Sequence, residues 1–393
     1  MTDAVIVSAC RTAIGTAFKG TLADTSALDL AHTVVEASVA RSGLGPDAFD
    51  DVVLGEAMYG GGDIARHAAI TTGLTGVPGL AHNRHCASGM AAVQTAAASI
   101  RAGMDEAVVA GGVQSSSTSP RSRYRLPGGD EWVDPWVSPS HPDRPDAPNM
   151  DMSITVGWNA ARKVGVTRED MDAWALRSHR NAIAAIDEGR FEDEVVPHEV
   201  VGRDGSKTTF AVDEHPRRGT SMEKLAQLKV LHPEIEGFSI TAGNACGAND
   251  GAAAVVVTSD GLAARHGLTP LATVRSWASV GVDPAETGLA PTLAIPKALA
   301  RAGVDLGDVD LFEINEAFAA MCVASIRVLD IDPELVNVSG SGCGLGHPIA
   351  ATGARMITTL VHELRRRGGG VGVAAMCAGG GIGSATVLEV HGA

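Results

Sequence analysis

An internal duplication constrains this fold more than any other feature of the sequence. Two parts of the chain match when one is shifted by 260 residues. The aligned pairs are residues 40–43 (Ala-Arg-Ser-Gly) with 300–303 (Ala-Arg-Ala-Gly), Asp50 with Asp310, and Glu56-Ala57 with Glu316-Ala317. At the same offset Cys86 falls on Gly346, beside His347. Duplicated halves bring matching positions together, so we expect a thiol and an imidazole to share one site.

Composition and charge exclude several kinds of partner. The 393 residues are 45% hydrophobic and 20% charged, which predicts two or three well-packed domains. A net charge of −15 opposes binding to nucleic acid or to an anionic membrane, because Lys and Arg hold both. A phosphate-bearing ligand would need a local basic patch, and Arg217-Arg218 with Lys224 and Lys229 is the densest candidate.

The cysteines and the apolar runs indicate a reduced compartment and no membrane span. No apolar run reaches the roughly 20 residues that a span requires, and the first residues carry no secretion signal. The cysteines form no C-x-x-C pair, so we expect no disulfide framework, no metal and a cytoplasmic location. They are Cys10, Cys86, Cys246, Cys322, Cys343 and Cys377.

Short Val-rich runs alternate with longer Ala-rich patterns, which predicts an α/β fold with a mainly parallel sheet. The expected strands are 4–8, 51–55, 106–110, 252–258, 272–279, 309–314, 335–339, 370–376 and 385–390. The expected helices are 27–42, 87–102, 168–188, 292–302, 317–329 and 350–367. Residues 115–149 are rich in Ser, Pro, Arg and Trp and, with 150–241, predict an insert between the two halves. We expect strand 252–258 to return to the first half.

Two cysteines lie where free backbone N–H groups are expected. Cys86 precedes a small-residue helix start, whose dipole would lower the thiol pKa and favour the nucleophilic thiolate. Cys377 is followed by Ala378 and then by glycines at 379–381, whose N–H groups suit an oxyanion hole. Each also has a structural alternative, as a buried core thiol or as a strand-end residue before a turn.

A glycine loop and a strand-to-helix switch complete the candidate chemistry. Residues 339–348 (Ser-Gly-Ser-Gly-Cys-Gly-Leu-Gly-His-Pro) predict a backbone that passes close to a ligand, with His347 opening a helix at Pro348. No glycine run fits G-x-G-x-x-G or a P-loop, so no nucleotide cofactor is expected. Asn315 is suited to orient a water or a carbonyl, and Glu316 to begin a helix. An N-terminal cap is the alternative for this pair.

Together these motifs resemble the thiolases, the acetyl-CoA acyltransferases, over essentially the whole chain. The last three of the matching segments distinguish thiolases from ketoacyl synthases, which share the fold and a nucleophilic cysteine. The segments are Arg11-Thr12, 86–89 (Cys-Ala-Ser-Gly), 244–252 (Asn-Ala-Cys-Gly-Ala-Asn-Asp-Gly-Ala), 315–318 (Asn-Glu-Ala-Phe), 346–348 (Gly-His-Pro) and 377–381 (Cys-Ala-Gly-Gly-Gly).

The resemblance implies a five-layered αβαβα fold made of two similar halves with an inserted loop domain. Residues 1–115 plus about 250–268 would form the N-terminal half, 116–249 the CoA-binding loop domain, and 269–393 the C-terminal half. The implied partners are acyl-CoA, CoA and further copies of the chain in a homodimer or homotetramer. No cofactor is implied beyond the CoA thioester substrates.

The resemblance also implies a ping-pong reaction through an acyl-cysteine. Cys86, activated by His347, would take the acyl group, and Cys377 as a thiolate would remove the α-proton of acetyl-CoA. The N–H groups of Cys86 and Gly379 would stabilise one thioester oxygen, and His347 with a water held by Asn315 would stabilise the other. The CoA-binding residues would be Arg217, Cys246, Met152, Phe318 and Ala242.

Departures from the family pattern leave the substrate open. Cys246 replaces the usual Ser of Asn-Ala-Ser-Gly, which weakens a hydrogen bond, and Asp151 stands where bacterial biosynthetic members carry His. The substrate is therefore either acetoacetyl-CoA or a longer, branched or ring-derived 3-ketoacyl-CoA. A synthase that condenses without thiolysis and a silent acyl-CoA-binding protein are the remaining alternatives.

Overall fold

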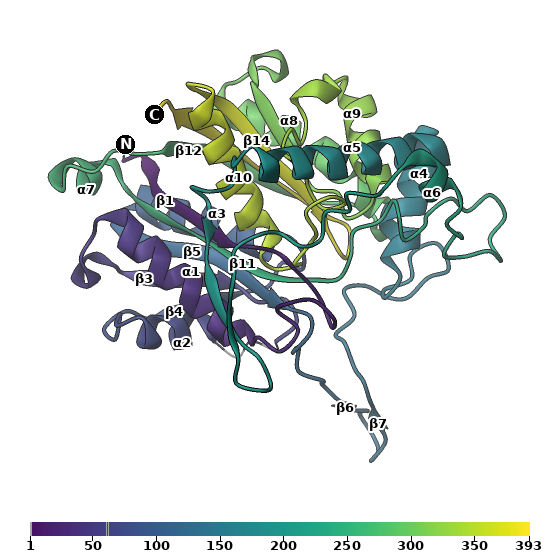
Figure 1. The fold of residues 1–393 in the computed structure, drawn as a ribbon, viewed down its shortest axis with the longest axis horizontal. Helices are drawn as coiled ribbons and strands as arrows, with labels where there is room; N and C mark the ends of the chain where they lie inside the picture. The colour runs from purple at the N-terminus through teal and green to yellow at the C-terminus, as the bar shows by residue number, and fades with distance from the viewer. Residues whose placement is uncertain (1, 60, 62) are drawn as a thin grey trace.

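The computed structural model describes residues 2–59, 61 and 63–393 (Figure 1). The first elements are β1 (Ala4–Thr12), β2 (Gly15–Thr16), α1 (Ala27–Ser42), β3 (Asp51–Gly55), α2 (Ile64–Thr71), β4 (Gly79–His82), α3 (Ser88–Ala102) and β5 (Ala107–Ser115). The middle part contains β6 (Tyr124–Arg125), β7 (Trp132–Val133), a π-helix (Ser153–Trp158), α4 (Asn159–Val164), α5 (Arg168–Asp187), β8 (Val195–Val196), β9 (His198–Val201), β10 (Lys207–Phe210) and α6 (Met222–Ala226).

The last part contains β11 (Asn249–Ser259), α7 (Asp260–Arg265), β12 (Ala272–Gly281), α8 (Pro291–Ala302), β13 (Leu311–Ile314), α9 (Ala319–Leu329), α10 (Thr352–Arg366), β14 (Gly369–Ala378) and β15 (Ile382–His391). Short 3-10 helices cover Pro46–Ala48, Pro284–Leu289, Leu306–Asp308 and Pro333–Leu335. The predicted helices agree with α1, α3, α5, α8, α9 and α10 to within two residues at each end.

The large sheet is mixed, so the expectation of a mainly parallel sheet is wrong. Its strands follow the order β4, β3, β5, β11, β1, β12, β15, β14, β13. The inner pairs from β5 to β14 are antiparallel, and the pairs β4–β3, β3–β5 and β14–β13 are parallel. A Val-rich run indicates where a strand lies, but it does not indicate whether that strand runs parallel or antiparallel to its neighbours. The short turn at residues 379–381 joins β14 to β15 and permits only an antiparallel pair.

The structure confirms the internal duplication. The first half orders its strands β4, β3, β5, β11, β1, and the second half repeats that order with Val336 bridged to β13, followed by β14, β15 and β12. The helices α1 and α8 end at Ser42 and Ala302, which are separated by the 260-residue offset. The two halves join where Val5 and Ile6 of β1 pair with β12.

The strand predicted at 335–339 is reduced to one bridge, between Val336 and Phe312. Asn337 follows with φ +52°, which turns the chain out of the strand direction. Its side chain takes over the pairing, because Oδ1 accepts from Ile314 N at 2.9 Å and Nδ2 donates to Ile314 O at 2.8 Å. The side chain therefore satisfies the backbone groups that another strand residue would have paired.

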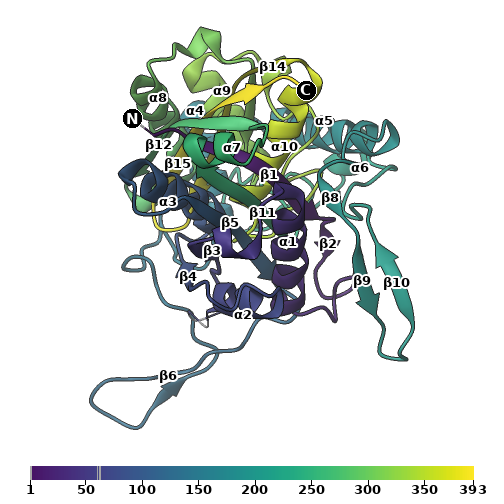
Figure 2. The same cartoon turned by 90° about the vertical axis from the view of Figure 1, so that its left-hand side faces the viewer.

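The elements pack as five layers, as the resemblance implied. The helices α1 and α2 cover the outer face of the first half-sheet, α3 and α10 lie between the half-sheets, and α8 and α9 cover the outer face of the second. Figure 2 shows this order from α8 and α9 toward the top to α2 toward the bottom. The central layer is almost wholly buried, which fixes the loops at the ends of α3 and α10.

Residues between β5 and β11 supply the rest of the molecule. β11 lies between β1 and β5 in the sheet. The β6–β7 hairpin projects away from the body of the protein in both ribbon views (Figures 1 and 2), and Tyr124 stacks on Trp136 with ring centroids 4.9 Å apart. In the described part of the chain, no helix has the length and apolar character needed to cross a membrane.

Candidate active site

Cys86, His347 and Cys377 line one cavity of about 180 Å³. Cys86 lies just before α3, Cys377 lies near the end of β14, and His347 lies between the glycine loop and α10. Most of the surrounding side chains are apolar, so a charge formed in the cavity is poorly solvated. Other lining residues are Met152, Val156, Cys246, Ala317, Phe318 and Gly379.

Cys86 precedes α3 as predicted, but His347 does not open α10, contrary to the sequence prediction. α3 begins at Ser88 with Ala87 as the N-cap, and α10 begins at Thr352. Pro348 starts the turn before α10, because its carbonyl accepts from Ala351 N at 2.9 Å and from Thr352 N at 3.0 Å. A glycine-rich loop followed by a proline indicates that a helix is near. Here a turn stands between the proline and the helix, so the helix begins later than the proline.

The Cys86 thiol is protonated in the free protein. Burial raises its pKa to about 11, and a hydrogen bond from the backbone of Gly379 acts in the opposite direction without compensating. The predicted lowering of this pKa is therefore wrong, because the apolar walls penalise the thiolate more than nearby N–H groups stabilise it. The site needs a proton acceptor for Cys86 to react at neutral pH.

The His347 imidazole is suited to be that acceptor. Burial and the positive charge of Arg355 lower its pKa to about 3, so the ring is neutral. Nδ1 lies 2.6 Å from Oγ1 of Thr352, and that hydroxyl donates its own hydrogen to Pro348 O at 3.0 Å. The hydroxyl therefore accepts from Nδ1–H, which leaves the lone pair on Nε2. Asn249 Oδ1 fixes the backbone by accepting from His347 N at 2.9 Å.

Asn315 lies next to the free nitrogen of this histidine. Its Nδ2 is 3.5 Å from His347 Nε2. Its Oδ1 is buried and has no hydrogen-bond partner among the described residues. The backbone of Gly342 packs close to this oxygen, since a Cβ there would lie 3.0 Å from it. A buried amide in this state is suited to hold a water molecule, as the sequence predicted for Asn315.

Glu316 holds the glycine loop and does not cap a helix. α9 begins at Ala319, its N-cap is Phe318, and no side chain caps it, so the capping alternative for Asn315-Glu316 is wrong. The buried Glu316 carboxylate instead accepts hydrogen bonds from four groups, which fixes the loop that leads to His347. They are Trp174 Nε1 at 2.9 Å, Asn337 Nδ2 at 2.7 Å, Ser178 Oγ at 2.5 Å and Cys343 N at 3.0 Å.

Sequence reasoning missed Glu316 as the centre of this network. A glutamate among small and apolar residues, between a strand and a helix, was the available signal. Its partners at Trp174 and Ser178 come from α5, 142 and 138 positions away along the chain. No local pattern links residues at that separation.

Cys377 is buried and close to two other sulfur atoms. Burial raises its pKa well above the ordinary value, and the neighbouring Cys86 and Cys246 raise it further. Its Sγ lies 3.3 Å from Sδ of Met321. A thioether gives a thiolate little stabilisation, so the free protein holds Cys377 as a neutral thiol.

Three of the five residues expected to contact CoA line the cavity. Met152, Cys246 and Phe318 are lining residues, whereas Ala242 is exposed and Arg217 lies outside the lining. Arg217 follows the buried His215 and donates its backbone N–H to His179 Nδ1 at 3.3 Å. The rest of the basic patch is partly paired, since Arg218 contacts Asp187 at 2.5 Å and Lys224 donates to Gly219 O at 2.6 Å.

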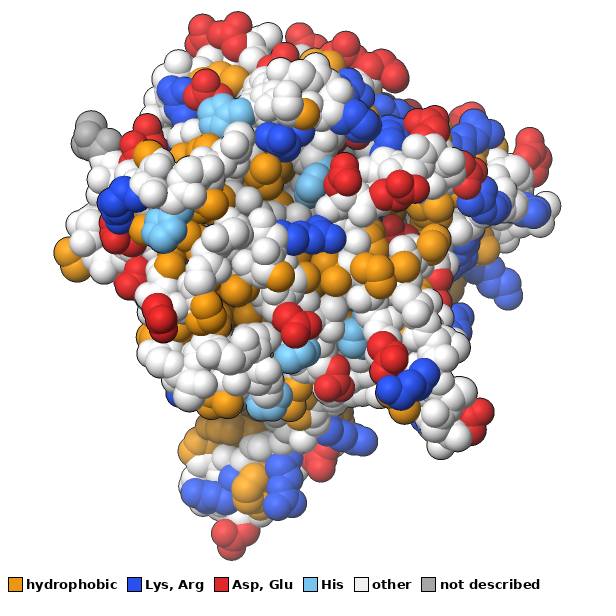
Figure 3. Space-filling view, turned by 60° about the vertical axis from the view of Figure 1, so that its left-hand side comes forward, with side chains coloured by type: hydrophobic (Ala, Val, Ile, Leu, Met, Phe, Trp, Pro, Cys, Tyr) orange, Lys and Arg blue, Asp and Glu red, His pale blue; other side chains and the backbone are white. Residues whose placement is uncertain are grey.

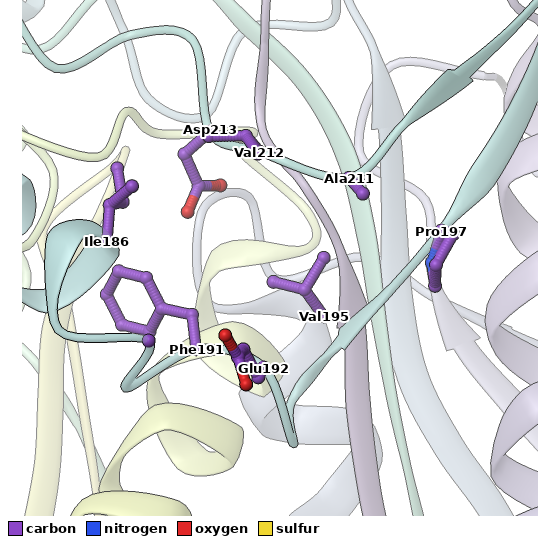
Figure 4. Close-up of a pocket in the computed structure, with 9 residues that line it drawn as sticks. Ile186, Phe191, Glu192, Val195, Pro197, Ala211, Val212 and Asp213 are labelled. Atoms are coloured by element: carbon purple, nitrogen blue, oxygen red, sulfur yellow. The ribbon is translucent and has the colours of Figure 1, made fainter.

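A second cavity of about 290 Å³ lies beside β8 and the start of β9. Figure 4 shows the Asp213 carboxylate at this cavity near Ile186 and Phe191. That carboxylate is held by the buried Arg11, whose Nη1 and Nη2 donate to it at 2.7 and 2.9 Å. The Asp213 carboxylate is therefore already paired, and the other lining carboxylate, Glu192, is exposed. Across residues 2–59, 61 and 63–393, no His, Cys, Asp or Glu side chains are grouped as a metal site requires.

Comparisons with known proteins match the chain from one end to the other. Residues 4–261 match the family model "Thiolase, N-terminal domain", and residues 268–390 match "Thiolase, C-terminal domain". The acetyl-CoA acetyltransferase of Escherichia coli (strain K12) is 42% identical over 404 residues and covers 99% of both chains. The crystal structure of the Bacillus anthracis acetyl-CoA acetyltransferase aligns with a TM-score of 0.89 at 39% identity, covering 99% of each chain. Human mitochondrial 3-ketoacyl-CoA thiolase aligns with a TM-score of 0.89 at 34% identity and the same coverage.

Proposed function

Because this chain belongs to the thiolase family, we propose that it cleaves a 3-ketoacyl-CoA with free CoA, giving acetyl-CoA and a shortened acyl-CoA. The reverse reaction is a Claisen condensation. Thiolases are acyltransferases that act on CoA thioesters and need no cofactor. The shared cavity of Cys86, His347 and Cys377 carries the proposal. Purified protein should consume a 3-ketoacyl-CoA only when free CoA is present, and no consumption of any such substrate would contradict it.

Acyl transfer begins with a proton moving from Cys86 to His347. Burial raises the pKa of the thiol and lowers that of the imidazole, so the charged pair is unstable by itself and Nε2 takes the proton only as sulfur attacks the carbonyl carbon. In the condensing direction the carbon–sulfur bond of acetyl-CoA breaks, CoA leaves with a proton, and acetyl-Cys86 remains. Backbone N–H groups of Cys86 and Gly379 are suited to bind the oxygen on which charge develops.

Carbon–carbon bond formation then requires a base for the α-proton of a second acetyl-CoA. We assign this role to Cys377. Cys86 raises the pKa of Cys377 only in its charged form, and an acylated Cys86 cannot ionise, so it does not oppose the ionisation of the second thiol. The enolate oxygen would receive a hydrogen bond from a water held by Asn315, and one from His347 when its Nε2 carries a proton, and the enolate carbon attacks acetyl-Cys86.

The binding of CoA is assigned to the insert between the two halves. We propose that residues 116–249 form the CoA-binding domain, between an N-terminal half of 1–115 plus about 250–268 and a C-terminal half of 269–393. Met152, Cys246 and Phe318 line the cavity and would contact the thiol end of CoA. Arg217 is charged and would face the phosphates, and Ala242 would contact the pantetheine arm farther from the sulfur.

Changing Cys246 to serine tests its contact with CoA. A hydroxyl donates a stronger hydrogen bond than a thiol, so we expect Cys246→Ser to lower KM for CoA about two- to tenfold and to leave kcat nearly unchanged. Steady-state kinetics with varied CoA measure both parameters. A large loss of kcat would show that Cys246 has a further role.

Changing Thr352 to valine tests how the tautomer of His347 is held. The variant removes the acceptor of Nδ1–H at 2.6 Å, so we expect kcat to fall about tenfold or more while KM changes little. Thr358→Val is the matched control on α10, because the buried Thr358 hydroxyl bonds to no described residue. Equal rates in the two variants would contradict the positioning role of Thr352.

The pH dependence of kcat/KM follows from the lowered pKa of His347. An ordinary histidine titrates near 6.5, whereas burial and Arg355 lower this pKa to about 3. The neutral base is present above that pKa and is lost as the pH falls through it. We therefore expect no acid limb near pH 6.5 in the free enzyme. An acid limb near pH 6.5 that persists when the exposed histidines are changed would contradict the neutral base.

The acyl chain remains a choice between acetoacetyl-CoA and longer, branched or ring-derived substrates. Thiolysis rates across such a series decide between them. A condensing enzyme without thiolysis would form a new carbon–carbon bond yet show no cleavage at high CoA. A silent binding protein would never carry an acyl group on Cys86. A place in fatty acid or lipid metabolism fits each of the catalytic alternatives.

We also propose a cytoplasmic homodimer or homotetramer. The cysteines of the described chain are free thiols, which suits a reducing compartment. The outer edge of β4 is unpaired in a single described chain, and an exposed strand edge favours pairing with a second copy. Figure 3 shows Arg and hydrophobic side chains together on the projecting hairpin, where Trp132 is half exposed. Light scattering distinguishes the two states by mass.

A further inference from the structure

The turn that presents Gly379 to Cys86 has no side chain to hold its shape. It consists of the three glycines 379–381 between β14 and β15, and the backbone of Gly379 donates a hydrogen bond to Cys86. Gly380 and Gly381 have φ values of +80° and +77°, in the region that favours glycine. Glycine is also the residue with the most backbone freedom. The place of the Gly379 N–H therefore depends on what the rest of the chain binds to this turn.

Thr287 binds the far end of the turn. It is buried in the 3-10 helix Pro284–Leu289, and its Oγ1 accepts from Gly381 N at 3.0 Å. The hydroxyl donates its own hydrogen to Pro284 O at 2.6 Å, so a lone pair is directed toward the turn. Val282 N donates to Gly381 O at 2.7 Å. Both backbone polar groups of Gly381 are thus bound by the same short segment.

Close packing connects this segment to a second wall of the active-site cavity. A Cβ on Gly381 would lie 2.2 Å from Val282 O, so the turn and the segment touch through their backbones. On the other side, a Cβ on Gly288 would lie 2.2 Å from the carbonyl oxygen of Val156 in the π-helix Ser153–Trp158. Val156 lines the cavity. Thr287 therefore lies between the π-helix wall and the glycine turn.

We propose that Thr287 is a positioning residue for acyl transfer, because its hydroxyl fixes the turn that carries the Gly379 N–H. The inference rests on the proposed function, in which this N–H binds the thioester oxygen as charge develops on it. Thr287 is not among the described lining residues of the cavity. Its effect passes through the backbone of Gly381 and Gly380 to Gly379, and a small displacement of an oxyanion donor slows the chemical step more than it weakens substrate binding.

Thr287→Val tests the proposal, because valine keeps the shape of the side chain and removes the acceptor of Gly381 N–H. The buried amide is left without a partner, so the turn should shift. We expect the maximal rate of Cys86 acetylation by acetyl-CoA to fall about tenfold, and the half-saturating acetyl-CoA concentration to change less than about twofold. Mass spectrometry of quenched samples measures both.

Two further variants separate the hydroxyl from the fold around it. Thr287→Ser keeps the hydroxyl and should react within about threefold of the wild type. Thr292→Val is the matched control at the start of α8, because the Thr292 hydroxyl donates to Leu289 O at 2.7 Å and not to the turn. It should keep the wild-type rate. Equal rates in Thr287→Val and the wild type, or equal losses in Thr287→Ser and Thr287→Val, would overturn the proposal.

Alkylation of Cys86 by iodoacetamide distinguishes the oxyanion donor from general damage to the site. This reaction uses the same sulfur but forms no charged oxygen, so Thr287→Val should slow it much less than it slows acetylation. Peptide mapping follows the Cys86 adduct in both reactions. Equal losses of the two rates would show that Thr287 supports the thiol and not the oxyanion donor, which would overturn the proposal. A wild-type protein that acetyl-CoA never acetylates would instead contradict the proposed function.

Discussion

Cys86→Ala should abolish both thiolysis and condensation, with a loss of at least about 10⁴-fold in kcat. The cavity offers other thiols, but they differ in their access to a base. Burial raises the pKa of Cys246 to about 12 and that of Cys377 well above its ordinary value, and a charge on Cys86 would raise both further. Only the thiol of Cys86 also receives a hydrogen bond from the backbone of Gly379. Neither neighbour should replace it.

The control for this variant is Cys10→Ala. Cys10 is a buried thiol on β1, far along the chain from the cavity, and its Sγ contacts Val34 O at 3.6 Å. We expect Cys10→Ala to lose some stability, because it removes a buried sulfur atom. Its kcat should be unchanged, because Cys10 does not line the active-site cavity. Rates are measured by the consumption of a 3-ketoacyl-CoA and by the formation of acetoacetyl-CoA from acetyl-CoA. Residual turnover within tenfold of the wild type in Cys86→Ala would rule out the acyl-Cys86 intermediate.

Cys377→Ala should separate the two halves of the reaction. Acylation of Cys86 uses His347 and Gly379, so acetyl-CoA should still transfer its acetyl group to this variant. Condensation needs a base for the α-proton, and its rate should fall by about 10³-fold or more. Mass spectrometry of the intact protein follows the first step, and the appearance of acetoacetyl-CoA follows the second.

The stability of Cys377→Ala must be compared with that of the wild type, since Cys377 is buried beside Met321. Removing one buried sulfur costs about 1 to 2 kcal/mol of unfolding free energy, which should leave the chain folded at room temperature. An acylated, folded variant that still condenses at the wild-type rate would show that another group removes the proton.

The order of the elements could be read from the sequence, but the direction of the strands could not. The match of residues 40–43 with 300–303 reflects the ends of α1 and α8, each closed by a glycine with positive φ. The antiparallel centre of the sheet depends on where β11 and β15 return, and a run of valines looks the same in either direction. The missing strand at 335–339 depends on one side chain, Asn337, whose bonds to Ile314 no periodicity predicts.

The site was predicted as a set of residues and not as a set of protonation states. Cys86, His347 and Cys377 share a cavity because the duplicated halves place the ends of α3, α10 and β14 together. The pKa of Cys86 was predicted in the wrong direction, since the local backbone was visible in the sequence and the apolar walls from distant segments were not. The same limit hid Glu316, whose partners come from α5.

Acetyl transfer to the wild-type enzyme tests the central claim most directly. A brief exposure to acetyl-CoA, acid quenching and peptide mapping should find one acetyl group per chain, on Cys86, and a chase with free CoA should remove it. The adduct should be absent from His347→Ala at the same early time and form slowly later. An acetyl group on Cys246 or Cys377, or a turning-over enzyme that carries none, would contradict the account.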